Sequence, residues 1–298
     1  MNYLINAIRG FFMALADSVP GVSGGTIAFI MGFYDKFINS LDDIIYGDKN
    51  KKKEAIKFLI KLGIGWIIGI VSAVLVLSSL FKSHIYAVSS LFIGFIVFSI
   101  PLIIKEEKDS LKGKYYNIIW TIIGIAIVAL ITYFNPMKAN ASSVDIIHFN
   151  FGMAIYMFFA AMVAISAMVL PGISGSTLML IFGLYIPTIT AAKELMHFNF
   201  ASAPALIIMG LGVIAGIVLV IRGIKLALKK YRSATMYMIL GLMLGSLYAI
   251  VMGPTTLEVP LDPMTFKTFK IITFILGGIL VVGLEFLKRY LERKQKNE

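Results

Sequence analysis

Serine and threonine hydroxyls occur beside glycines in two short segments of this chain that have almost the same sequence. The first segment is Pro20-Gly21-Val22-Ser23-Gly24-Gly25-Thr26, and Pro171-Gly172-Ile173-Ser174-Gly175-Ser176-Thr177 follows 151 residues later. Backbone N–H groups at the start of a helix, together with nearby hydroxyls, form sites that bind phosphate and other anions. Residues beyond the segments, such as Gly32 and Gly183, recur at the same offset. The repetition predicts a duplicated chain with one anion-binding element in each half.

Each segment interrupts a long apolar stretch, which predicts a helix–break–helix hairpin. Proline ends the preceding helix, glycine lets the chain turn, and serine or threonine caps the following helix. Inside a membrane such broken backbone is tolerated only where it is buried in protein or lines a water-filled cavity. Two breaks in corresponding halves are typical of a transporter's binding site. The flanking runs are Ile5 to Ala16, Ile27 to Phe37, Gly152 to Leu170 and Leu178 to Ala192.

The paired breaks predict one shared phosphate or anion site near the middle of the membrane. The alternative is a structural role in which the hydroxyls only cap helices at a packing turn; the duplication favours a site. Arg9 is the candidate counter-charge, although an arginine in this place can also reach the cytoplasmic headgroups. Asp17 lies eight residues later, about two helical turns, and is the candidate for ion coupling. The other candidate residues are Gly21, Ser23, Gly24, Gly25, Thr26, Gly172, Ser174, Gly175, Ser176 and Thr177.

A catalytic interpretation competes with the binding one. The stretch from Gly21 to Gly25 matches the G-x-S-x-G pattern of serine hydrolases and resembles intramembrane rhomboid proteases. An activated serine needs a base, most often histidine, within hydrogen-bond reach. The three histidines, His84, His148 and His197, lie in links expected on the outer face, whereas Ser23 follows an arm that enters from the cytoplasm. A non-enzymatic function is therefore preferred to an intramembrane hydrolase, and a small-anion channel is the third hypothesis.

The composition is that of an integral membrane protein. Of 298 residues 59% are hydrophobic and 14% are charged, with a mean hydropathy of +0.89, whereas soluble domains are about 25% charged. The net charge of +11 comes from basic clusters between apolar runs, as the positive-inside rule places them, which disfavours nucleic-acid binding. The absence of cysteine excludes disulfides and thiolate metal sites. No histidine or carboxylate cluster has metal-ligand spacing, so neither a metal nor a cofactor is expected.

The basic clusters predict one topology, with the charged links and the C-terminus in the cytoplasm. A charged loop from Asp48 to Lys57, a link from Lys105 to Lys114 and the tail after Leu287 are basic. The short link at 82–84 is expected outside, and so is the segment 135–150, where Lys138 is the one basic residue. The N-terminus is expected to be mature structure and not a signal peptide. The six runs expected to span are Phe58 to Phe81, Ile85 to Ile104, Tyr116 to Phe134, Ala203 to Ile221, Ala234 to Met252 and Phe269 to Leu287.

The two halves are expected to lie upside down relative to one another. Each half holds three crossings and a hairpin that, whether it re-enters or crosses fully, leaves the parity of the loops unchanged. The glycines of the later helices repeat at an offset of 147, with Gly63, Gly65 and Gly69 matching Gly210, Gly212 and Gly216. The expected fold is thus an all-α polytopic membrane protein of two inverted-topology repeats, residues 1–140 and 150–298, an architecture common in secondary transporters.

The paired segments, with Ala16-Asp17-Ser18-Val19 before the first and Leu170 before the second, resemble the bacterial PopT family of polyprenyl-phosphate transporters. The resemblance covers essentially the whole chain. It implies a plasma-membrane transporter that moves undecaprenyl phosphate, the lipid carrier of peptidoglycan synthesis, from the outer to the inner leaflet for reuse. It also implies that the stretches 21–26 and 172–177 contact the phosphate, while the prenyl tail stays among the membrane lipids.

Overall fold

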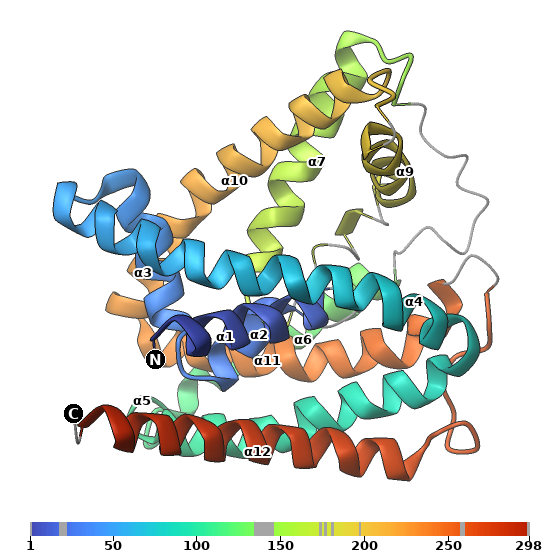
Figure 1. The fold of residues 1–298 in the computed structure, drawn as a ribbon. Helices are drawn as coiled ribbons and strands as arrows, with labels where there is room; N and C mark the ends of the chain where they lie inside the picture. The colour runs from blue at the N-terminus through green and yellow to red at the C-terminus, as the bar shows by residue number, and fades with distance from the viewer. Residues whose placement is uncertain are drawn as a thin grey trace.

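The computed structural model describes residues 2–17, 23–133, 146–172, 175, 178–179, 182–196, 198–256 and 260–296. All regular secondary structure in these ranges is helical, as the sequence predicts (Figure 1). The α-helices are α1 (Asn2–Asp17), α2 (Gly24–Ile30), α3 (Tyr34–Tyr46), α4 (Lys49–Glu106), α5 (Lys108–Leu111), α6 (Ile118–Tyr133), α7 (Phe151–Val169), α9 (Tyr185–Met196), α10 (Ala203–Lys230), α11 (Arg232–Met252) and α12 (Ile271–Lys296).

The protein is a multi-pass membrane protein. Within the described residues six helical segments are long and apolar enough to cross a bilayer. Five of them coincide with expected spans, and the sixth is α7, the first arm of the second hairpin. The expected last span lies in α12, whose continuous apolar part, Ile271–Gly283, is shorter. The six segments are Lys49–Ala73, His84–Glu106, Tyr115–Tyr133, Phe151–Val169, Ala203–Lys230 and Arg232–Thr255.

Helix α4 corrects two expected loops. The charged stretch from Asp48 to Lys57 is not a loop: Asp48 caps α4 by accepting hydrogen bonds from the N–H groups of Asn50 and Lys51, and the lysines form the first turns. Lysine is a good helix former, so a capped basic segment extends the spanning helix into water. The expected link at 82–84 is a kink at His84 (φ −140°, ψ 37°), where α4 doubles back on itself (Figure 1). The basic residues from Arg222 to Lys230, which follow the expected span Ala203 to Ile221, form the end of α10.

The second arm of each hairpin is itself broken. The expected run from Ile27 to Phe37 divides, because α2 ends at Ile30 and α3 begins at Tyr34. Gly32 turns the chain with φ of 66°, and Gly183 has the same φ of 66° just before α9. A glycine is needed at both positions because side-chain-bearing residues rarely adopt this conformation. Matching hydrogen bonds close the two turns, from Phe33 N to Ala28 O (3.0 Å) and from Leu184 N to Met179 O (2.9 Å).

Glycines at matching positions bring two pairs of helices into backbone contact. In the first half Gly65 of α4 lies against the carbonyl of Ala7 in α1, and in the second Gly212 of α10 lies against the carbonyl of Phe158 in α7. Both partners of each contact obey the offsets read from the sequence. Small residues permit such close packing in lipid. The next turn repeats the arrangement, with Gly69 on Phe11 and Gly216 on Met162.

Gly65→Ala should destabilise the protein, because the new Cβ would overlap the Ala7 carbonyl. We expect a loss of about 1–3 kcal/mol, the usual cost of overpacking. The matched control is Gly63→Ala, whose Cβ would have no atom within 4 Å; it should leave stability unchanged or raise it slightly. Thermal unfolding in detergent micelles measures the difference. The second half offers the same comparison, Gly212→Ala against Gly210→Ala, and equal losses in all four variants would contradict the packing.

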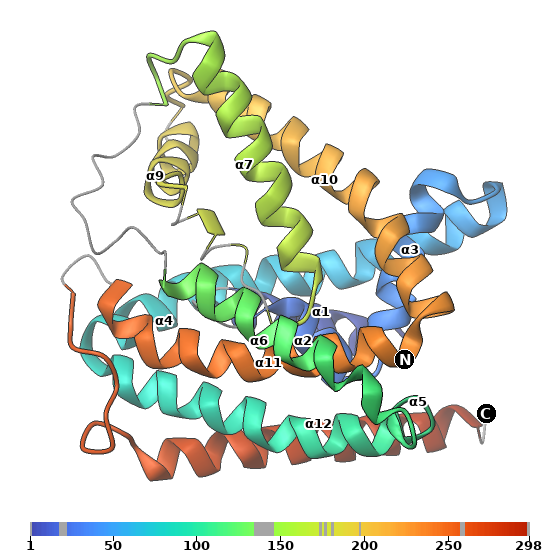
Figure 2. The same ribbon diagram turned by 180° about the vertical axis from the view of Figure 1, so that it is seen from behind.

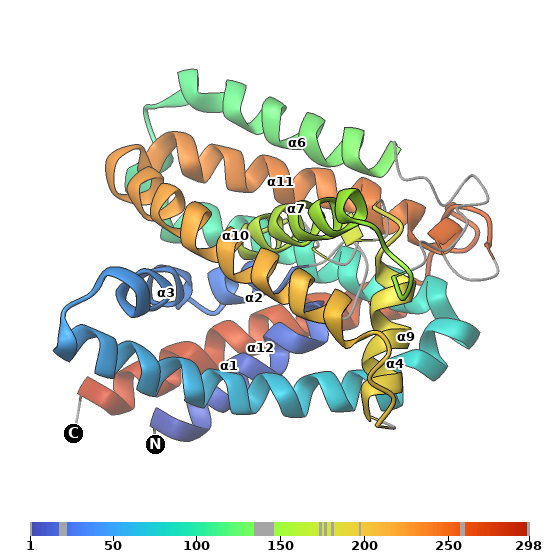
Figure 3. The same ribbon diagram turned by 90° about the horizontal axis from the view of Figure 1, so that it is seen from above.

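The two halves are interleaved. The third expected spanning helix of each half packs against the second spanning helix of the other half: Gly94 of α4 meets the Phe274 carbonyl of α12, and Gly241 of α11 meets the Thr121 carbonyl of α6. Figure 3 shows α6 and α11 side by side, and Figure 2 shows α7 ending between α6 and α10. The short helix α2, which follows the first break, lies within this assembly.

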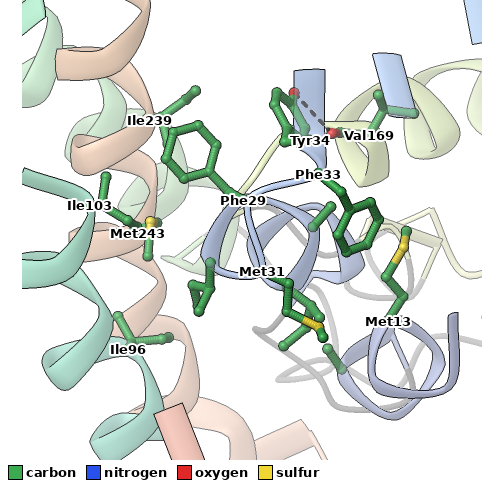
Figure 4. Packing of buried hydrophobic residues seen from close by; sticks show 14 of the residues in the cluster. Met13, Phe29, Met31, Phe33, Tyr34, Ile96, Ile103, Val169, Ile239 and Met243 are labelled. Atoms are coloured by element: carbon green, nitrogen blue, oxygen red, sulfur yellow. Dashed lines mark hydrogen bonds between the residues drawn. The ribbon is translucent and has the colours of Figure 1, made fainter. Parts of the chain in front are cut away.

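Burial of α2 is complete, since all seven of its residues are buried. Phe29 of α2 points toward Ile239 and Met243 of α11 (Figure 4). On the opposite side of α2, the turn that follows it packs near Met13 of α1. A helix this short is marginal alone, so packing supplies its stability. Its backbone polar groups must then find partners inside the protein.

Candidate functional site

The two breaks meet in the interior of the molecule. Ser23 of the first break is fully buried, and its Oγ lies 3.1 Å from the carbonyl oxygens of both Met168 and Leu170, at the end of α7. The same oxygen caps α2 by accepting a hydrogen bond from Gly25 N at 3.0 Å. The Ser23 hydroxyl thus joins the start of α2 to the carbonyls left free where α7 ends. The expectation that the two breaks converge holds for these residues.

Two more hydrogen bonds join the breaks. Gly172 N donates to Thr26 Oγ1 at 2.9 Å, and the Tyr34 hydroxyl donates to Val169 O at 3.2 Å (Figure 4). Thr26 is buried with 1% of its surface exposed. Gly172 has φ of 88°, and it turns the chain where the backbone of α11 leaves no room for a side chain. Ser23, Thr26 and Tyr34 therefore hold the breaks together in this conformation.

The carboxylate of Asp17, the last residue of α1, lies at the start of α2. Its Oδ1 accepts a hydrogen bond from Gly24 N at 2.7 Å, and its Oδ2 accepts one from the Trp66 indole N–H at 3.1 Å. A carboxylate at a helix N-terminus is favourable because the exposed N–H groups carry partial positive charge. The protein thus supplies its own anion at the first break.

At one matching position, the second break has a different side chain beside it. A Cβ built on Gly24 would lie 2.7 Å from a carboxylate oxygen of Asp17, and one built on Gly175 would lie 2.9 Å from the Met168 side chain. Met168 follows Asp17 by 151 residues. The position that carries a carboxylate in the first half therefore carries a thioether in the second, and the two breaks differ in charge.

A cavity of about 220 Å³ lies beside the junction, the place where Ser23 and Thr26 bond to Leu170 and Gly172. Among the described residues that line it, Asp17 is the one ionisable residue, and Trp66, Gly25 and Met168 lie in the same lining. The remaining walls are mostly apolar and come from α1, α3, α4, α7 and α10: Met13, Phe37, Leu41, Leu59, Leu62, Gly63, Ile165, Val169 and Ile217.

The other candidate residues differ in how the structure places them. The Arg9 guanidinium lies 4.9 Å from the centre of the Phe33 ring and donates a hydrogen bond to Asn6 Oδ1 at 3.3 Å. This places Arg9 against the turn that follows α2, although it is absent from the lining of the 220 Å³ cavity. Arg222, a basic residue that follows the expected span Ala203 to Ile221 and is not among the candidates, lies over the Tyr46 ring, 4.3 Å from its centre. Four candidates fall outside the described residues: Gly21, Ser174, Ser176 and Thr177.

Two polar groups on the helices around the site were not predicted from the sequence. The first is Trp66, and its signal was present, since an indole N–H within an apolar helix needs an acceptor. The second is an ion-pair cluster in which Arg232 binds Glu107 (Nε to Oε2, 2.9 Å) and Asp35 (3.0 Å). Burial alone would raise the pKa of Glu107. The hydrogen bond and positive charge of Arg232 have the larger combined effect and hold the pKa of Glu107 below its ordinary value. No spacing in the sequence links these three residues, which come from α3, α11 and the end of α4.

Comparison with known families matches residues 13–268 to the family described as undecaprenyl phosphate translocase-like. A polyprenyl-phosphate transporter of Staphylococcus aureus is 35% identical over 283 residues, which cover 94% of this chain and 95% of that protein. A polyprenyl-phosphate transporter of Vibrio cholerae is 29% identical over 318 residues, covering 96% and 97%. No solved structure matches significantly. Because the match spans both breaks and the helices that hold them, the chain belongs to the undecaprenyl phosphate translocase-like family.

Proposed function

We propose that this protein transports undecaprenyl phosphate across the plasma membrane, from the outer to the inner leaflet, for reuse in cell-wall synthesis. The observation that carries the proposal is the meeting of two broken hairpins inside a multi-pass membrane protein. Broken helices at membrane depth form the substrate sites of secondary transporters. The relatives named polyprenyl-phosphate transporter support this substrate class.

The phosphate binds where the two breaks meet, and the hydrogen bonds between the breaks close this site when no lipid is bound. Here Ser23, Thr26 and Gly172 satisfy one another, and Asp17 satisfies the N–H of Gly24. When the halves move apart in alternating access, these groups lose their partners and become free to bind the phosphate oxygens. The contacts come from the stretches 21–26 and 172–177, with Arg9 beside the turn after α2 as counter-charge.

Asp17 couples transport to an ion. A phosphate at the start of α2 would compete with the Asp17 carboxylate for the same N–H group and would repel it in an apolar surrounding. Neutralising Asp17 with a proton removes both obstacles. The corresponding Met168 cannot take up a proton, so coupling belongs to the first half alone.

Two inverted repeats supply the movement. The repeated turns at Gly32 and Gly183 and the matched glycine contacts support a common structure for the two halves. The basic ends of α4, α10 and α12 lie in the cytoplasm according to the positive-inside rule. An upside-down relation between similar halves lets one state open to each side of the membrane.

A transporter accounts for Ser23 better than a serine hydrolase does. The described partners of its hydroxyl are backbone groups, and the side chain is 0% exposed. A nucleophile needs a base within hydrogen-bond reach and access to substrate. A channel would need a continuous polar path, whereas the lining of the junction cavity is mostly apolar.

Deletion of the protein tests the proposal in cells. Undecaprenyl phosphate should accumulate in the outer leaflet, where its headgroup becomes accessible to an impermeant phosphate-binding antibiotic. Re-expression of the wild-type chain should reverse the accumulation, provided that no other transporter masks the loss. Unchanged accessibility in cells that lack every other such transporter would refute the outer-to-inner direction.

A further inference from the structure

A second, larger cavity of about 900 Å³ opens between α6, α10 and α11. This volume is within the range of small-molecule sites. One end of its lining is basic and aromatic, and the other end is apolar. Its lining residues are Lys114, Tyr116, Asn117, Trp120, Ile127, Leu170, Ile224, Ala227, Lys229, Lys230, Tyr231, Arg232, Ser233, Ala234, Thr235, Met238, Ile239 and Leu242.

The apolar end of this groove reaches the junction of the breaks. Leu170 lines the groove, and its carbonyl oxygen is one of the two that lie against Ser23 Oγ. Leu242 also lines it, and the backbone of Leu242 lies where a side chain on Gly172 would have to go. The groove therefore runs from the proposed transport site toward the ends of α6, α10 and α11, where Lys114, Lys230 and Arg232 line it.

The basic end carries three lysines that make no ion pair among the described residues, in contrast to Arg232, which is bound to Glu107 and Asp35. These lysines are Lys114, Lys229 and Lys230, and all are exposed.

Aromatic side chains lie beside the lysines. Lys230 Nζ is 5.5 Å from the centre of the Tyr231 ring, and Tyr116 and Trp120 line the same end. Tyrosine and tryptophan favour the membrane–water interface. Basic pockets between membrane helices bind anionic lipid headgroups. The chemistry of this end suits a phosphate headgroup at the interface.

We propose that this groove is a lipid port in which a polyprenyl phosphate is held with its phosphate at Lys114, Lys229 and Lys230 and its first isoprene units against Trp120 and Met238. This inference rests on the proposed function and adds a second binding place for the same substrate. Continuity with the junction favours the transported lipid over a resident membrane lipid. A phosphate monoester also carries up to two charges, whereas phosphatidylglycerol carries one, and three lysines without an ion pair among the described residues complement the greater charge.

Binding of farnesyl phosphate to the purified full chain tests the port. The variant combines Lys114→Gln, Lys229→Gln and Lys230→Gln. Its matched control, Lys49→Gln with Lys53→Gln and Lys57→Gln, removes the same charge from exposed lysines of α4. The port variant should bind farnesyl phosphate at least tenfold more weakly than wild type, since each interfacial lysine contributes about fivefold to anionic-lipid affinity. The control should bind like wild type, and the two variants should unfold at the same temperature.

A second pair of variants tests the apolar part of the groove. Ala227→Trp places an indole in the groove, whereas Leu226→Trp places one on the neighbouring outward-facing position, where the native leucine is 58% exposed. Of these two variants, only Ala227→Trp should weaken the binding of farnesyl phosphate. Inorganic phosphate, which lacks a prenyl chain, should compete poorly with farnesyl phosphate on the wild-type protein.

The outcomes separate this proposal from the transport proposal. Equal farnesyl phosphate binding by the port variant and its control would overturn the port, even if the wild-type protein moves polyprenyl phosphate between leaflets. Competition by phosphatidylglycerol at the same concentration as farnesyl phosphate would overturn it too, by showing a general site for anionic lipids. A wild-type protein that fails to move the lipid refutes transport, whatever the lysine variants bind.

Discussion

Gly172→Ala should abolish most transport and should lower stability by roughly 3 kcal/mol. Two costs add at this position. A side chain in the left-handed region costs about 1–2 kcal/mol, and Gly172 has φ of 88°. The new Cβ would also lie 2.5 Å from the carbonyl carbon of Leu242 and 2.6 Å from Met243 N, so the backbone of α11 would have to move, at a further cost of about 1–3 kcal/mol. The displacement would break the hydrogen bond from Gly172 N to Thr26.

Gly113→Ala is the matched control for this variant. Gly113 has a similar φ of 77°, yet a Cβ there would meet nothing within 4 Å. Its variant bears the conformational cost without the clash and should keep its transport. Thermal unfolding in micelles and lipid transport in vesicles measure both effects. Equal behaviour of the two variants would show that α11 does not press on the second break.

Asp17→Asn should uncouple transport from the proton gradient while leaving the fold in place. The amide keeps an oxygen that can accept from Gly24 N but carries no charge and takes up no proton. We expect a loss of about 1 kcal/mol of stability, the usual value of one hydrogen bond, and no stimulation of transport by an imposed pH gradient. Transport into vesicles with and without the gradient is the measurement.

Trp66→Phe is the control for Asp17→Asn. It removes one donor to Asp17 but keeps the carboxylate and the aromatic packing. This variant should still respond to the gradient, with a similar modest loss of stability. If Asp17→Asn responded to the gradient as strongly as wild type, Asp17 would be only a helix cap.

The two broken hairpins were predictable because their signal is local. Proline, glycines and hydroxyls in one short segment determine a break wherever the segment lies, and the repeat doubles the signal. The close helix contacts were predictable for a similar reason, since Gly65 and Gly212 recur at one offset and now prove to lie on matching carbonyls. The pattern could not distinguish these from Gly63 and Gly210, which have open space around them. Which face of a helix meets a neighbour depends on tertiary packing.

Helix ends and long-range polar contacts could not be read in the same way. The lysines after Asp48 suggested a loop because charge usually marks water, yet a capped helix can extend into water. The bond between Thr26 and Gly172, and the cluster of Arg232 with Glu107, join residues more than a hundred positions apart. Such pairs depend on how the two halves of the chain pack together, and the residue type at a single position does not indicate its distant partner.

Transport by the purified protein tests the central claim most directly. The protein is reconstituted into vesicles that carry a fluorescent polyprenyl phosphate, and an impermeant phosphatase reports the fraction of headgroups on the outside. Vesicles with wild-type protein should expose all of the lipid to the phosphatase within the assay, whereas protein-free vesicles and Gly172→Ala vesicles should keep the inner half protected. If wild-type vesicles protect the inner half as well as protein-free vesicles do, the protein does not move polyprenyl phosphate between leaflets.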